Sequence, residues 1–129
     1  MTNQSLQVGD LVLASNKSGV YIAEIIDLLP LKATIQTLAV VKHPLQGDLH
    51  HPYEANVSVF HQRRALSYRE RFMTLLSQLE PYEGEVPEYQ ESLRDALDRE
   101  ITELGQQDGK WAELSLQQYK LLKQEYVNR

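Results

Sequence analysis

The hydrophobic pattern of this chain changes its period at residues 81–87, and this change restricts the fold more than any other feature. Before the segment, apolar residues form short runs rich in Val, Ile, Tyr and Thr and bounded by Gly, Pro, Asn or Asp, as in strands. After it, apolar residues recur at three- and four-residue spacings, as in amphipathic helices. The segment itself, PYEGEVP, contains two prolines and a glycine, which indicates a linker. We therefore predict a strand-rich part at 1–80 and a linker with two helices at 81–129.

The first part contains three clear strand candidates at 11–15, 19–29 and 32–41. A fourth strand is predicted at 63–72, because the strand period separates apolar from basic residues better than the helical period does. The octapeptide at 73–80 is predicted to form a short helix. Several short strands joined by close turns favour a small barrel over an α/β layer.

The second part predicts an antiparallel helical hairpin packed on or beside the barrel. The apolar stripe of the first helix comprises Tyr89, Leu93, Ala96, Leu97, Ile101 and Leu104. The corresponding face of the second helix comprises Ala112, Leu116, Tyr119 and Tyr126. The predicted fold class is therefore β-rich α+β.

Composition excludes several classes of protein. The chain has 129 residues, 42% hydrophobic and 24% charged, as expected for one compact domain. A formal net charge of −5 gives no general attraction to nucleic acid or anionic membranes. The absence of cysteine excludes disulfides, thiol catalysis and lipids attached through cysteine. Neither a signal peptide nor a membrane-spanning run is present, so we expect a soluble cytoplasmic protein without direct membrane insertion.

The histidine-rich stretch HPLQGDLHH at 43–51 raises the question of a metal site. His43, Asp48, one of the adjacent pair His50 and His51, and His61 could converge on one ion through the fold. Neighbouring histidines on a strand point to opposite faces, however, and no H-x-x-x-H spacing occurs. Proline and the Gly-Asp pair are turn formers, so we interpret the stretch as a loop and predict no metal site.

Catalytic motifs are also lacking. No serine lies in a G-x-S-x-G context, and the six glycines form neither a phosphate-binding nor a dinucleotide-binding loop. We therefore predict no enzyme activity, no catalytic residues and no cofactor.

Two kinds of binding surface remain. The predicted strand at 63–72 carries Arg63, Arg69 and Arg71 on one face, which could follow a phosphate backbone, although the acidic net charge opposes this. The first helix is acidic and includes Asp95 and Asp98, although surface charges commonly have no dedicated partner. Partner binding fits best, since a helical pair beside a small barrel offers a rigid surface with few reactive groups.

Several motifs, in order along nearly the whole chain, resemble the kinase-associated protein B family of spore-forming bacilli. They are VGD (8–10), LAVVKHPLQGDLH (38–50), ANV (55–57), FHQRRALSYRE (60–70), PYEGE (81–85) and P-x-Y-x-ESL (87–93). The resemblance implies an SH3-like barrel followed by helices. It also implies a non-enzymatic regulatory protein of the sporulation phosphorelay that supports a membrane-bound sensor histidine kinase.

The expected partner is therefore a sensor histidine kinase or another phosphorelay protein, with the chain peripheral to a membrane kinase. A second copy of the chain is a further partner, and nucleic acid is the alternative ligand. The resemblance supplies no catalytic or metal-binding residues. The partner-binding residues we predict are His43, Gln46, Asp48, His50, His61, Arg63, Arg69, Arg71, Asp95 and Asp98.

Overall fold

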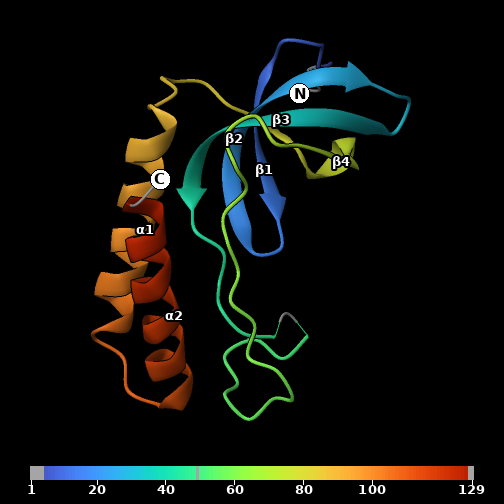
Figure 1. Cartoon of the computed structure of the whole chain (residues 1–129). Helices are drawn as coiled ribbons and strands as arrows, with labels where there is room; N and C mark the ends of the chain where they lie inside the picture. Colours follow the sequence, from blue (N-terminus) through green and yellow to red (C-terminus); the bar gives the residue numbers. More distant parts are fainter. Residues whose placement is uncertain (1–4, 49, 128–129) are drawn as a thin grey trace.

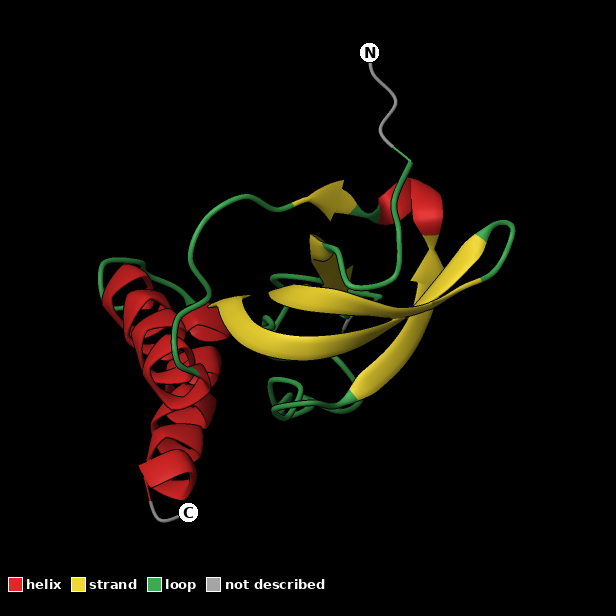
Figure 2. Cartoon of the chain, turned by 90° about the horizontal axis from the view of Figure 1, so that it is seen from above, coloured by secondary structure: helices red, strands yellow, loops and turns green. Residues whose placement is uncertain are grey.

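A computed structural model describes residues 5–48 and 50–127 of the chain (Figure 1). A curved antiparallel sheet is followed by two helices that lie on one side of it, as the view from above shows (Figure 2). The elements in chain order are β1 (Leu11–Asn16), β2 (Gly19–Leu28), β3 (Lys32–Lys42), β4 (Arg71–Leu75), a 3-10 turn (Leu76–Gln78), β5 (Glu80–Pro81), α1 (Tyr89–Leu104) and α2 (Lys110–Val127). The predicted α+β class is confirmed.

The sheet has the order β4-β3-β2-β1-β5, and all its pairings are antiparallel. Strands β1 and β2 are joined by the two residues Lys17 and Ser18, whose φ angles of 47° and 72° match the tight hairpin turns that suit strand twist. The first three predicted strands are confirmed. Strands β4 and β5 form the two edges of the sheet and are not hydrogen-bonded to each other, so the predicted barrel is not closed. An SH3-like arrangement of the strands stays a prediction.

Two hydrophobic clusters hold the molecule together. One lies within the curve of the sheet and is built from alternate residues of β1, β2 and β3, such as Val12, Ile25 and Ile35. The other joins sheet to helices: Tyr21 and Val40 pack against the apolar faces of α1 and α2. The two predicted C-terminal helices are thus confirmed, and their apolar faces contact the sheet.

Helix α1 begins after Glu88, whose carboxylate accepts hydrogen bonds from the main-chain N–H groups of Gln90 and Glu91. These bonds satisfy N–H groups that have no partner within the helix, and they hold the pKa of Glu88 below its usual value. Ser92 then links the helix to the sheet, because its hydroxyl accepts a 2.9 Å hydrogen bond from the N–H of Val40.

The predicted strand at 63–72 is wrong. The main-chain N–H groups of Arg63, Ala65 and Leu66 donate to side chains instead of to a neighbouring strand. A turn with Arg69 at φ 69° then interrupts the segment. The fourth strand starts only at Arg71, where it pairs with β3. The predicted helix at 73–80 is reduced to the 3-10 turn, with strand residues on both sides of it. The connection between β3 and β4 is therefore one long loop, residues 43–70.

Candidate functional site

His43 is fully buried where the long loop leaves the sheet and meets the helices. Its Nδ1 lies 3.0 Å from the carbonyl oxygen of Pro44, which can only accept, so Nδ1 carries the proton. Its Nε2 therefore accepts from the hydroxyl of Tyr126 at 3.0 Å. Burial lowers the pKa of His43 to about 4, against a smaller opposing effect of the Pro44 hydrogen bond. The imidazole is thus neutral at neutral pH, with both nitrogens occupied.

Four tyrosine hydroxyls hold the main chain of the loop, and we call them the tyrosine junction: Tyr21, Tyr89, Tyr119 and Tyr126. The N–H of Ala65 donates to Tyr126 and that of Leu66 to Tyr21, both at 3.2 Å. Tyr89 donates to the Leu66 carbonyl, and Tyr119 donates to Pro44 at 2.9 Å. These hydrogen bonds provide partners for main-chain N–H and C=O groups that have no neighbouring strand to bond to. The tyrosine junction therefore fixes the position of the loop.

Burial also raises the pKa of two junction tyrosines. Desolvation raises the pKa of Tyr21 to about 12, although the hydrogen bond from Leu66 opposes the change. It raises the pKa of Tyr119 further, and the carboxylate of Glu100 adds to the effect. Both hydroxyls therefore stay protonated, and their contacts with the loop are those of neutral groups.

Gln46 joins the two arms of the loop. Its side-chain Nε2 donates to the Arg63 carbonyl at 2.9 Å, and its Oε1 accepts from the Arg63 N–H at 2.9 Å. The main-chain carbonyl of Gln46 also accepts from the indole of Trp111 in α2, at 3.3 Å. Gln46 is 3% exposed. His43 and Gln46 therefore lie inside the protein, where they shape the loop without reaching its surface.

The tip of the loop is exposed and bends where the sequence predicts. Gly47 has φ 102°, and a Cβ there would lie 3.0 Å from the ring of Phe60, so both conformation and space require glycine. Asp48 continues the turn, since its carboxylate accepts from the N–H of His50 at 2.9 Å. The side chains of His50 and His61 are exposed. Across residues 5–48 and 50–127, no group of three or more His, Asp or Glu could hold a metal ion.

The three predicted arginines do not form one row. Arg63 donates from Nε to the carbonyl oxygen of Gly47 at 3.0 Å and is half-buried in the loop. Arg69 lies in the turn with its guanidinium 5.2 Å from the centre of the neighbouring tyrosine ring. Arg71 starts β4 and donates to the side chain of Gln36 at 3.0 Å. A continuous phosphate-binding strand face is therefore not present at these positions.

The acidic helix is partly neutralised within the molecule. Asp98 forms a 3.0 Å ion pair with Lys123 of α2, and the buried Glu100 forms a 2.9 Å pair with Lys42 of β3. Asp95 is exposed and has no ion pair among the residues described. Of the two predicted aspartates, Asp95 is thus the one available to a partner.

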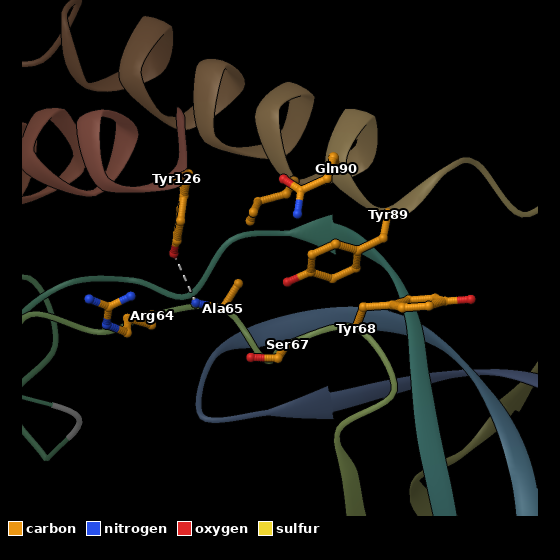
Figure 3. A pocket seen from close by; sticks show the side chains of 8 residues that line it. Arg64, Ala65, Ser67, Tyr68, Tyr89, Gln90 and Tyr126 are labelled. Atoms are coloured by element: carbon orange, nitrogen blue, oxygen red, sulfur yellow. Dashed lines mark hydrogen bonds between the residues drawn. The ribbon is translucent and has the colours of Figure 1, made fainter. Parts of the chain in front are cut away.

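A groove runs beside the N-terminal end of α1, and we call it the α1 groove. Two hollows of about 300 and 480 Å³ meet at Tyr68, Tyr89 and Gln90. Figure 3 shows the two tyrosine rings side by side, with their centres 5.7 Å apart. The remaining lining residues are Arg64, Ala65, Ser67, Leu93 and Tyr126 on one side and Leu38, Val86, Pro87 and Glu88 on the other.

Sequence reasoning missed the α1 groove and the tyrosine junction. It assigned Tyr119 and Tyr126 to an apolar face, because periodicity reports burial and says nothing about hydroxyl partners. The incorrect strand also gave no reason to expect Tyr68 beside Tyr89, although their rings are in contact. A usable signal was the number of tyrosines, seven in 129 residues, since buried tyrosine hydroxyls need partners.

Comparison with known proteins gives consistent results. A family model described as kinase associated protein B matches residues 16–127. Kinase-associated lipoprotein B from Bacillus subtilis (strain 168) is 42% identical over 125 residues, which cover 97% of this chain and 98% of the relative. The crystal structure of kinase-associated protein B from Bacillus cereus superposes with a TM-score of 0.80 and 32% identity, covering 95% of this chain and 99% of that one.

Proposed function

This chain belongs to the kinase-associated protein B family, and we propose on that basis that it is a non-enzymatic accessory protein of the sporulation phosphorelay. In this proposal it supports a sensor histidine kinase through direct protein contacts. The names of its relatives support association with a kinase, and the α1 groove supplies a surface for such a contact.

The α1 groove is the observation that carries the proposal. Tyr68, where the two hollows meet, is 50% exposed, and Val86, in the larger of the two, is 37% exposed, so apolar surface is available in the groove. Exposed aromatic side chains next to hollows are typical anchors of protein interfaces. The groups with strongly raised or lowered pKa values, Tyr21, His43 and Tyr119, are instead buried and occupied by the loop. This separation favours a binding surface over a reactive one.

The membrane connection is proposed to come from the partner. The relative from Bacillus subtilis is named a lipoprotein, whereas this chain has no cysteine to acylate. Within residues 5–48 and 50–127, no helix has the length and apolarity to cross a bilayer. We therefore propose a cytoplasmic protein that reaches the membrane by binding its kinase.

The test is recovery of a sensor histidine kinase by the tagged protein from its host entering starvation, with and without nuclease treatment. Tyr68→Ser removes the exposed ring of the α1 groove and should lower recovery by roughly tenfold or more. Tyr53→Ser is the matched control, because Tyr53 is 64% exposed and also pairs with an aromatic ring, that of Trp111. It should leave recovery unchanged.

Other outcomes would relocate or reject the contact. If Asp95→Lys abolishes recovery while Tyr68→Ser does not, the acidic helix carries the contact instead of the groove. Recovery that is lost on nuclease treatment would support the nucleic-acid alternative and contradict the proposal. Failure to recover any sensor kinase with the unmodified protein would also contradict it.

A further inference from the structure

Strand β4 leaves one edge of the sheet open. Leu76 donates to the carbonyl of Leu31 at 3.0 Å, and Thr37 donates to that of Glu70 at 2.9 Å. In an antiparallel ladder, the main-chain N–H and C=O groups of successive residues point alternately towards and away from the neighbouring strand. These two bonds therefore show which β4 residues direct their main-chain groups towards β3. The main-chain N–H and C=O groups that point away from the sheet are those of Arg71, Met73 and Leu75. Within the part of the chain that the structure describes, these groups have no main-chain partner.

Two of the three exposed side chains beside this open edge are apolar, and the third is that of Arg71. Met73 is 55% exposed and Leu75 43% exposed. Figure 1 shows β4 at the end of the sheet away from α1 and α2, so the helices do not cover it. An exposed apolar edge strand readily pairs with another chain, and natural proteins usually protect such edges with charges, proline or a covering segment.

The sheet itself indicates which strand can occupy this edge. Its other edge, β5, has only two residues and includes Pro81, which has no N–H to donate, so head-to-tail pairing of copies is disfavoured. Antiparallel pairing of β4 with itself has no such restriction. A two-fold axis at Met73 places each outward-facing residue opposite another: Met73 faces Met73, and Arg71 faces Leu75 of the other copy. The two arginines then lie roughly 14 Å apart, so like charges do not oppose each other.

We propose that β4 is a self-association strand, through which two copies pair antiparallel about a two-fold axis at Met73. The three outward residues of each copy would form hydrogen-bonded pairs, and the exposed parts of Met73 and Leu75 would be buried. A five-residue edge gives a small interface, so association is weak and depends on concentration. This proposal is independent of the kinase-related function.

Disulfide cross-linking tests both the interface and its register, because the chain contains no cysteine and single-cysteine variants have no background. Hydrogen-bonded antiparallel pairs have Cα atoms about 5.5 Å apart, which a disulfide can bridge. Met73→Cys should therefore form a covalent dimer on mild oxidation. Arg71→Cys and Leu75→Cys should each stay monomeric alone and should cross-link to one another when mixed, as measured by intact-protein mass spectrometry.

Val59→Cys is the matched control for random collisions, because Val59 is 54% exposed, almost the same as Met73, and lies in the long loop. Equal cross-linking of the Val59 and Met73 variants would overturn the proposal. Cross-linking of the Arg71 variant with itself, without the mixed product, would overturn the two-fold register.

The unmodified protein gives an independent measurement. Analytical ultracentrifugation over a hundredfold range of concentration should show the average mass rising towards twice the monomer mass. Met73→Pro should abolish this rise and leave the melting temperature nearly unchanged, since the N–H it removes faces away from β3. An unmodified protein that stays monomeric over the whole range would overturn the proposal, and the β4 edge would then be left to a different occupant.

Discussion

Replacing Tyr126 by phenylalanine should destabilise the protein more than the same replacement at Tyr119, although both rings are buried. The Tyr126 hydroxyl is the partner of His43 Nε2 at 3.0 Å and of the Ala65 N–H at 3.2 Å. Its removal leaves two groups without this partner, one of them in a fully buried imidazole. Since an unsatisfied buried group costs about 1–3 kcal/mol, we expect Tyr126→Phe to lower the free energy of unfolding by about 3 kcal/mol.

Tyr119 provides the control because its hydroxyl partner has other donors. The Pro44 carbonyl accepts from Tyr119 and also from His43 Nδ1 and Gln46 Nε2, at 3.0 and 3.2 Å respectively. Tyr119→Phe therefore removes the bond to Pro44 and a contact with the Gln46 side chain, but it leaves no group empty, because Gln46 also bonds to Pro44 and Arg63. The expected loss is about 1 kcal/mol, the net value of an ordinary hydrogen bond.

Urea-induced unfolding followed by circular dichroism measures both losses. The transition midpoint should fall about three times as far for Tyr126→Phe as for Tyr119→Phe, with the dependence on urea unchanged in both. Equal losses, or a larger loss for Tyr119→Phe, would refute the reasoning that unsatisfied groups dominate the energetics of the tyrosine junction.

Three further predictions follow from the loop and its supports. The pKa of His43 is about 4 in the folded state and 6.5 in the unfolded state, so the neutral imidazole contributes fully to stability above pH 6.5, and this contribution is lost as pH falls towards 4. In acid titrations of stability, the free energy of unfolding should fall by about 3 kcal/mol from this cause, and the fall should be absent in His43→Gln. Gly47→Ala should cost about 2–3 kcal/mol in thermal unfolding, whereas Gly9→Ala, with a similar φ but open space, should cost about 1 kcal/mol. Glu100→Gln removes the ion pair with Lys42 and should lower the free energy of unfolding by about 1–2 kcal/mol. The loss is smaller than for a fully buried ion pair because the Lys42 side chain is 42% exposed and reaches water. An unchanged free energy of unfolding would contradict a stabilising Lys42–Glu100 pair.

The spacing of apolar residues in the sequence predicted those strands and helices in which buried residues recur at regular intervals. The first three strands and both helices have buried residues at every second or every third and fourth position, so the pattern located them. The segment at 63–72 also alternates, but the main-chain groups of Ala65 and Leu66 bond to side chains from β2, α1 and α2, and only the end of the segment pairs with β3. No local pattern reports such distant partners, and the strand prediction failed for that reason.

The candidate site was predicted less completely than the fold. The sequence located a loop at 43–51 and its bend at Gly47, since turn residues act locally. It could not tell that His43 and Gln46 face inwards while His50 and His61 face solvent. That difference depends on α2, whose tyrosines contact His43 from residues far along the chain. The partner-binding role of the predicted residues stays a prediction.

The tyrosine junction also has a consequence for the order in which the molecule can acquire its structure during synthesis. Strands β1 to β3 pair through short connections and can form early. The loop at 43–70 gains three of its four tyrosine supports only when α1 and α2 have been made; Tyr126, for example, holds His43 and Ala65 across separations of 83 and 61 residues. Until then the Ala65 N–H and the Leu66 carbonyl lack their tyrosine partners, and the α1 groove does not exist. A newly made chain therefore acquires its proposed binding surface last, after the sheet that carries it has folded.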